Sequence, residues 1–510
     1  MSQTSDNNKR IAKNTIFLYV RLLFLLIANF YTSRVVLDKL GVQDFGIYNV
    51  VGGFAIIFVF FRSSLANATQ RYLNVELGKN NTEGVHKIFC LHQSIYILIS
   101  IVLFIIAETV GTWFVLNKLI IPPSRMVAAF WVYQFTVLSL IVTILSVVYD
   151  AIIVAKENMK IYSYVGIFEG LAKLIVAFLI AYSPYDRLVT YGFLLLIVAL
   201  GIRLFYSFYC RKKYEESKFR FDWNIKSFKE ALGMIGWNSI GAAVYAINDQ
   251  GINVLLNLFF GPTVNAARAI AFQVSGAIGN FGLSFYTSVR PQLVKSYSVG
   301  NYEYLYKLFF YSSKYSVFLL WFMCLPVMLS IDFFLNIWLT KIPEYTNVFT
   351  LLVLLYSIVN VLNQPIWSLA LAIGKLKYYM LIGSGVFLMS FPISYVCLKM
   401  GASPISVFVI NILVRCIYII AVLEVLNKYI RISMKQYFFK VVKPTLLVIG
   451  MSSALSLIIN SFFCQKIFER LSISCLSIVI NTVCIYSFGL NKNEKIKFIS
   501  TIKQKITCIK

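Results

Sequence analysis

Histidine, acidic residues and paired cysteines are scarce in this chain. It has 2 histidines and 21 Asp and Glu residues among 510. His86 and His92 are too few for a zinc cluster, and none of the nine cysteines forms a Cys-x-x-Cys pair. The chain also lacks the His, Asp and Glu constellation of a membrane enzyme of polysaccharide assembly. We therefore expect no metal, no cofactor and no enzyme active site.

Charge is also scarce, whereas apolar residues are abundant. Only 13% of the residues are charged and 59% are hydrophobic, and the mean hydropathy is +0.76. Apolar runs of about 20 residues recur, and each is long enough to cross roughly 30 Å of hydrocarbon. A membrane barrel would show short alternating segments instead. These runs predict an all-α, polytopic membrane protein. No cleavable signal peptide is expected, because the polar, basic start leads directly into the first span.

The basic residues lie mainly in alternate short loops between the apolar runs. This pattern argues against a nucleic-acid partner despite the net charge of +26, because positive charge in such loops sets membrane topology. An even number of spans puts all the basic loops on one side, so both termini should be cytoplasmic. We expect 14 spans, at residues 14–35, 45–67, 88–112, 126–150, 161–182, 188–209, 232–259, 264–288, 304–328, 347–371, 378–398, 404–426, 439–460 and 471–489.

Two stretches of the chain look like copies of one another. Residues 40–81 and 260–301 share a glycine-marked turn, an apolar span and a polar exit, and Gly41 matches Gly261. Such a repeat indicates a duplicated half-molecule. We expect four regions: a six-helix lobe (1–210), a basic cytoplasmic linker (211–231), a second six-helix lobe (232–428), and two extra spans with a basic cytoplasmic tail (429–510).

Four ionisable residues lie within equivalent spans of the two halves. Arg21 and Arg62 fall in the first and second spans, and Asp249 and Arg268 in the seventh and eighth. An arginine at the centre of a bilayer costs about 3 kcal/mol on insertion scales, so a wet cavity is a better place for it than lipid. We expect these side chains to line a cavity between the halves, and their net positive charge favours an anionic substrate.

Polar residues extend this candidate site. Asn253 continues the polar face of the seventh span, and Asn360 and Gln364 share a face of the tenth, where Pro365 should kink the helix. The candidate substrate-binding residues are Arg21, Arg62, Arg268, Asn253, Asn360 and Gln364, with Asp249 as the candidate for ion coupling.

Other charges within the spans have more ordinary interpretations. Glu169 and Lys173 lie four residues apart and should neutralise each other. Asp150 should act as a cap or interface residue at a span end. Arg34, Arg71, Arg290 and Lys314 are close enough to a span end to extend toward the membrane surface. For Arg203 and Arg415 a structural ion pair and a place in the cavity both remain open.

The segments LGVQDFGIYNVVGGF (residues 40–54) and AIIVAKENMKIYSYVGIFEGLAKL (residues 151–174) resemble bacterial polysaccharide flippases. These Wzx-like proteins belong to the multidrug/oligosaccharidyl-lipid/polysaccharide exporter (MATE/MOP) superfamily. The resemblance implies a V-shaped bundle of two six-helix halves plus two C-terminal helices. It implies flipping of undecaprenyl-pyrophosphate-linked O-antigen or capsular repeat units across the bacterial inner membrane, by alternating access through a cationic cavity.

The resemblance also suggests partners and roles for individual residues. Its partners would be the lipid-linked oligosaccharide and membrane lipids, with polysaccharide assembly proteins as a further option. Arginines in related flippases match Arg21, Arg62 and Arg268 by location, and these would bind pyrophosphate or acidic sugars. Asp249 would pair with one of them or take up a coupling H⁺ or Na⁺. Two alternatives stay open: lipid II as the substrate, and an ion-coupled multidrug or organic-cation antiporter of the same superfamily, which would need carboxylates in its cavity.

Overall fold

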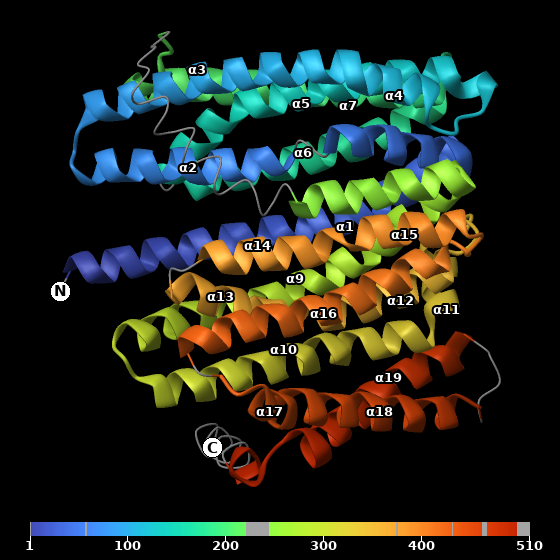
Figure 1. Cartoon of the computed structure of the whole chain (residues 1–510). Coiled ribbons are helices and arrows are strands. Elements are labelled where there is room, and N and C mark those ends of the chain that lie inside the picture. The colour runs from blue at the N-terminus through green and yellow to red at the C-terminus, as the bar shows by residue number, and fades with distance from the viewer. Residues whose placement is uncertain are drawn as a thin grey trace. The chain divides into compact units, whose positions relative to one another are not determined.

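The computed structural model describes residues 2–56, 59–156, 158–220, 244–373, 376–430, 432–461 and 467–496. Within these ranges the chain is helical and contains no strand (Figure 1), which confirms the all-α prediction. Eleven helices in the described part are long and apolar enough to cross a membrane. The chain is therefore a multi-pass membrane protein. The eleven are Val20–Gly53, Thr82–Asn117, Pro123–Ala155, Met159–Tyr182, Arg187–Lys213, Tyr302–Leu329, Thr346–Ala370, Tyr379–Lys399, Ile405–Ile430, Met434–Ser461 and Ser472–Gly489.

Three of the fourteen expected spans are not among these eleven, namely 45–67, 232–259 and 264–288. Helices nevertheless occupy what is described of each: the end of α1 with α2 (Val59–Gly78), a helix over 244–260, and α9 (Pro262–Ser298). The linker residues 221–231, and the polar positions Asn238 and Ala242 of the expected seventh span, lie outside the described residues.

Contacts divide the chain into two compact units, which are described separately. The first comprises Met1–Ala269 and Trp338–Glu344. Its inner packing joins α5 to α7, α1 to α6 and α2 to α5. One buried core forms around Phe89, Tyr96 and Tyr149, and another around Val132 and Tyr133. Its helices are α1 (Ser2–Ile56), α2, α3 (Thr82–Ile106), α4 (Thr112–Asn117), α5 (Met126–Ala155), α6 (Met159–Leu179), α7 (Arg187–Lys213), the helix 244–260 and the start of α9.

The second unit comprises Ile270–Ile337 and Tyr345–Lys510. The expected kink near Pro365 is confirmed, because the helix is interrupted at Leu362. Proline lacks an N–H, and its ring displaces the carbonyl group one turn earlier. The helices of this unit are the rest of α9, α10 (Tyr302–Leu329), α11 (Ile331–Trp338), α12 (Thr346–Val361), α13 (Asn363–Ile373), α14 (Leu376–Leu388), α15 (Ser390–Lys399), α16 (Ile405–Ile430), α17 (Met434–Tyr437), α18 (Lys443–Ser461) and α19 (Ile467–Cys484).

The backbone repeats itself where the two sequence copies match. Gly41, with φ 81°, divides α1 into two helical segments. Gly261, with φ 78°, separates the helix 244–260 from α9. In neither case does a longer loop intervene. Glycine suits both positions because residues with a Cβ rarely adopt this conformation. At the other end of the copies, Asn81 caps α3 by accepting the Gly84 N–H, and Asn301 caps α10 by accepting the Tyr304 N–H. The same chain turn is thus built twice.

Candidate functional site

Arg21 lies on α1 against α6. Its guanidinium carbon is 4.3 Å from the centre of the Tyr162 ring, a distance at which the cation is attracted to the ring face. A Cβ atom on Gly166 would lie 2.1 Å from Arg21 Nε, so the glycine provides the space that the guanidinium occupies. Arg21 Nε is buried, and no described residue accepts a hydrogen bond from it. The structure thus leaves donor capacity on Arg21.

Arg62 on α2 is held by a carboxylate of α5. Its Nη2 atom is 3.0 Å from Asp150 Oδ2, and the other oxygen of Asp150 is buried without a partner in the described part. Asp150 does not cap its helix, whereas its expected place near the membrane interface stays a prediction. Helix α5 continues to Ala155, so Asp150 lies inside it and needs a cation to compensate its burial.

A second acidic residue completes this charged group. Lys173 Nζ lies 2.6 Å from Glu169 Oε1, one turn away on α6. This ion pair confirms the expected neutralisation. Both Arg21 and Arg62 lie close enough to Asp150 and Glu169 to interact electrostatically with them. The first unit therefore gathers three cations and two carboxylates. We call Arg21, Arg62, Asp150, Glu169 and Lys173 the charged cluster.

Arg268 and Asp249 form a separate ion pair between α9 and the helix 244–260. Arg268 Nη2 is 2.6 Å from Asp249 Oδ1 and 3.0 Å from the Asp249 carbonyl oxygen. Arg268 is buried, with 6% of its surface exposed. Of the two roles that the sequence left for Asp249, the structure shows the pairing with an arginine.

Asn253 lies one turn further along the same helix, in an amide network. The Asn265 side chain donates to the Asn253 backbone and side-chain oxygens at 2.7 and 2.8 Å. Asn253 in turn donates to the Asn49 carbonyl at 3.3 Å. Gly53 allows this close approach, because a Cβ there would lie 2.8 Å from Asn253 Nδ2. In this conformation the Asn253 amide ties the helix 244–260 to α1.

Asn360 and Gln364 belong to the second unit. They are partly buried on either side of the break at Leu362. Asn363, between them, accepts a 2.9 Å hydrogen bond from the Tyr379 hydroxyl. The polar face expected in the tenth span thus falls where its helix is interrupted.

Lys314 departs from its expected position. It was expected to extend toward the membrane surface, but it is 1% exposed. Its Nζ donates to both oxygens of Glu494 at 2.8 Å and to the Gly489 carbonyl at 3.0 Å. Glu494 is the one acidic residue after Glu469 in the sequence, which was the only available hint. A carboxylate from the end of the chain thus compensates the buried lysine.

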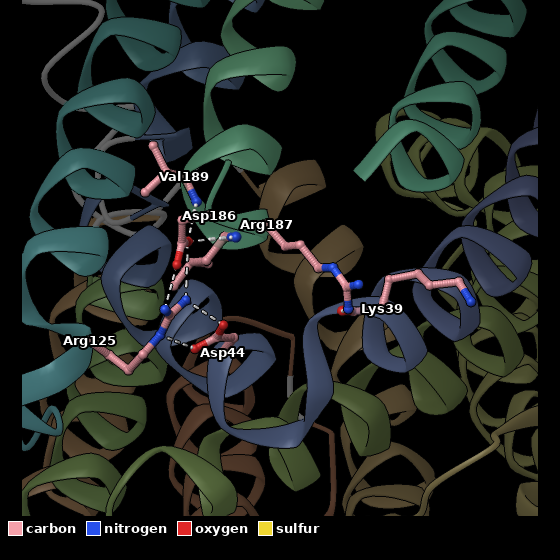
Figure 2. Close-up of polar contacts among 7 residues, drawn as sticks. Lys39, Asp44, Arg125, Asp186, Arg187 and Val189 are labelled. Atoms are coloured by element: carbon pink, nitrogen blue, oxygen red, sulfur yellow. Dashed lines mark hydrogen bonds and ion pairs between the residues drawn. The ribbon is translucent and has the colours of Figure 1, made fainter. Parts of the chain in front are cut away.

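Arg125 joins three helices of the first unit (Figure 2). Its Nε is 2.8 Å from Asp44 Oδ1 on α1, and its Nη2 is 3.1 Å from Asp186 Oδ1. Asp186 also caps α7, by accepting from the Leu188 and Val189 N–H groups. Burial raises the pKa of Asp186, but the hydrogen bonds from Arg125 and the α7 amides outweigh it, and the net shift is downward. We call Arg125, Asp44 and Asp186 the clamp; it ties the residue before α5 to α1 and to the start of α7.

No protein-family model matches the sequence, and no curated protein matches it.

Solved structures provide the comparison instead. A multidrug resistance MATE family transporter of the MOP superfamily, in an inward-facing conformation, has a TM-score of 0.67 at 12% identity over 81% of this chain and 98% of its own. The lipid II flippase MurJ, in an inward closed conformation, has a TM-score of 0.63 at 16% identity over 92% and 99%. A MOP superfamily transporter from Pyrococcus furiosus, described as having a binding pocket of reverse polarity, has a TM-score of 0.55 at 13% identity over 83% and 96%.

These likenesses define the class of fold. The chain is a multi-pass helical membrane protein with the fold of MATE/MOP transporters. The same fold is found in a lipid flippase and in multidrug transporters.

Proposed function

We propose that the chain flips an undecaprenyl-pyrophosphate-linked oligosaccharide, an O-antigen or capsular repeat unit, from the cytoplasmic to the outer leaflet of a bacterial inner membrane. The observation that carries this proposal is the state of Arg21. Its guanidinium lies within a membrane-spanning helix, against Tyr162, with donor capacity that no described residue uses. Guanidinium groups match phosphate and carboxylate oxygens by paired hydrogen bonds.

A cationic, polar site is suited to carrying the head group of such a substrate across the membrane. The pyrophosphate and sugars cannot enter hydrocarbon without losing their hydrogen bonds to water. The polyprenyl tail can remain in the lipid throughout. A protein therefore needs to surround only the head group with cations and polar groups. In this proposal the acidic part of the head group is bound by Arg21, Arg62 and Arg268. The sugars are bound by Asn253, Asn360 and Gln364.

Asp249 is the residue proposed for coupling. It is paired with Arg268 in the structure, so an anionic head group that draws Arg268 away would free the carboxylate. A free carboxylate can take up H⁺ or Na⁺, which would link substrate release to an ion gradient. Alternating access of the two halves would then carry the head group across.

The carboxylates weigh against transport of organic cations. Asp150, Glu169 and Asp249 each have a basic partner at 2.6 to 3.0 Å. A cationic drug would have to displace these partners, whereas an anion would meet the free donors of Arg21. The charged cluster thus has the polarity that an anionic substrate requires.

The test is a flipping assay with purified protein in proteoliposomes. Undecaprenyl-pyrophosphate-linked oligosaccharide is placed in the inner leaflet, and its appearance outside is followed with a sugar-modifying enzyme. Arg21→Gln should reduce flipping at least tenfold, because the head group loses a cation. Arg187→Gln is the matched control, since Arg187 donates to the Lys39 carbonyl and lies outside the charged cluster.

Parallel vesicles with lipid II or with a cationic dye separate the alternatives. If only lipid II is flipped, lipid II is the substrate in place of the oligosaccharide repeat unit, and the proposed mechanism still holds. Dye transport without flipping of either lipid would overturn the proposal in favour of the antiporter. Equal flipping by wild type and Arg21→Gln would remove Arg21 from the scheme.

A further inference from the structure

Arg415 is a buried cation of the second unit. It lies on α16 and is 4% exposed. From Ile405, where α16 begins, it is about 15 Å along the helix axis, which is half of the roughly 30 Å of hydrocarbon that the helix must cross. Arg415 thus lies near the middle of α16, and an unbalanced charge is least tolerated near the middle of a membrane-spanning helix.

Aromatic rings are the partners that the structure gives Arg415. The guanidinium carbon is 4.3 Å from the centre of the Tyr418 ring and 5.7 Å from that of Phe387. Its Nε atom is buried without a hydrogen-bond partner, and no hydrogen bond or ion pair joins Arg415 to any described residue. A guanidinium carries five N–H donors and does not lose its charge. Ring faces compensate part of the charge, but they accept none of these hydrogen bonds in the ordinary way.

The surrounding helices offer no carboxylate. No Asp or Glu occurs between Glu344 and Glu424 in the sequence, a stretch that includes all of α12 to α15 and most of α16. Helix α17, which also contacts α16, has none either. Helix α10 packs on α12 and α13, but its Glu303 is paired with Lys307 at 2.8 Å. Among the described residues, Arg415 therefore has no carboxylate as a counterion.

A comparison within the chain shows that the lack of an acceptor at Arg415 does not follow from its local sequence, Arg-x-x-Tyr. Arg203 of α7 is followed three residues later by Tyr206, as Arg415 is by Tyr418. Arg203 also stacks on an aromatic ring, that of Tyr149 at 4.6 Å. Its guanidinium, however, donates to the Leu145 carbonyl oxygen. The same sequence motif thus has a hydrogen-bond acceptor in the first unit and none among the described residues of the second.

Polar groups lie beside the unpaired arginine. The Tyr418 hydroxyl donates to the Tyr379 hydroxyl at 3.1 Å, and Tyr379 donates to Asn363 Oδ1 at 2.9 Å. Arg415 is close enough to Tyr379 to interact with it electrostatically. The chain of hydroxyl groups supplies hydrogen-bonding capacity next to the cation, as a polar ligand would require.

We infer that Arg415 is the centre of an oxyanion-binding site within the second unit, for a phosphate or carboxylate group. The planar guanidinium matches the paired oxygens of such groups, and the anion supplies the negative charge that α12 to α15, α17 and the part of α16 before Glu424 lack. The oxyanion can be free in solution or can belong to an acidic lipid-linked substrate. The inference does not depend on the proposed function, because binding is measurable without transport.

The test is thermal unfolding of the purified full-length protein, followed by tryptophan fluorescence, with increasing inorganic phosphate at constant ionic strength. All variants also carry Arg21→Gln, so that phosphate binding at the charged cluster does not dominate the measured rise in unfolding temperature. An anion that binds the folded state raises the unfolding temperature, and we expect a rise on the order of 2 °C. Arg415→Met should abolish the rise, whereas Arg203→Met should retain it. Arg415→Lys, which keeps the charge, should keep part of the rise.

A second arm identifies the source of the oxyanion. The same variants are unfolded in nanodiscs with and without undecaprenyl pyrophosphate. A rise that needs the lipid and Arg415 would assign the site to the substrate, and a rise with phosphate alone would assign it to a free anion. If Arg415→Met does not fold, Arg415→Lys carries the comparison, with a reduced rise supporting the site. Rises with both ligands that do not depend on residue 415 would overturn the inference and leave Arg415 as a cation stacked on aromatic rings.

Discussion

Arg21 Nε lies 2.1 Å from the position that a Cβ atom on Gly166 would occupy. The guanidinium of Arg21 on α1 can therefore occupy its position only because residue 166 on α6 has no side chain. Gly166→Ala should displace the guanidinium from Tyr162 and reduce flipping about as much as Arg21→Gln does. The flipping assay measures this effect.

A double-mutant comparison separates this effect from simple misfolding. In the Arg21→Gln background, Gly166→Ala should cost little further activity, because the two changes act on one group. Gly201→Ala is the control, since no atom lies within 4 Å of its added Cβ. It should leave flipping unchanged and stabilise by about 0.5–1 kcal/mol, because alanine favours the helix. Additive losses at residues 21 and 166 would contradict the explanation.

The ion pair of Arg62 and Asp150 should appear as energetic coupling. Asp150→Asn should destabilise the protein by about 1–3 kcal/mol, because it leaves buried polar groups poorly paired. In an Arg62→Gln background the same change should cost less. The measurement is a double-mutant cycle on unfolding free energies, with an expected coupling of roughly 0.5–3 kcal/mol. A coupling of zero would show that the two charges do not depend on each other.

The Lys314–Glu494 pair is more deeply buried than the Arg62–Asp150 pair, so substitution of one partner should destabilise the protein more. Lys314→Met or Glu494→Leu alone should cost about 3–5 kcal/mol, since each leaves a charge buried without its partner. The double variant should recover most of that loss, because an apolar pair of similar size needs no compensation. Thermal unfolding of the four proteins gives the answer. Control substitutions in the exposed Glu303–Lys307 pair should change little.

The clamp predicts a pH dependence. The pKa of Asp186 is lowered in the folded protein, so its contribution to stability is full above its unfolded pKa of about 3.9 and is lost as the pH falls through the lower, folded value. Arg125→Gln removes the part of this contribution that comes from Arg125 and leaves the part that comes from the α7 amides. Wild type should thus be more stable than the variant at neutral pH, and the difference should shrink below about pH 4. Unfolding temperatures measured across this range test it, and a difference independent of pH would exclude Asp186 as the cause.

Local patterns account for what the sequence predicts well. Apolar runs define the helices, and Gly41 and Gly261 mark the same turn in both copies because their left-handed backbone favours glycine. Pro365 interrupts its helix for an equally local reason. The Glu169–Lys173 pair follows from spacing along one helix.

Ion pairs across the chain were beyond such reasoning. Arg62 and Asp150 are 88 positions apart, and Lys314 and Glu494 are 180 apart. Which cation meets which carboxylate depends on how the helices pack, and no periodicity encodes that. Arg21 could be named as a candidate from its position in a span, but Tyr162 and Gly166, which hold it, carry no signal of their own.

The burial of Lys314 has a consequence for biosynthesis. Glu494 is synthesised 180 residues after Lys314, which at 5–20 residues per second is a delay of roughly ten to forty seconds. Helix α10 must therefore enter the membrane while its lysine lacks a counterion. The second unit can reach its final packing only after residue 494 has been synthesised. The segment that carries Glu494 then completes the packing around Lys314, and a ribosome that stops before this segment releases a chain with an uncompensated charge.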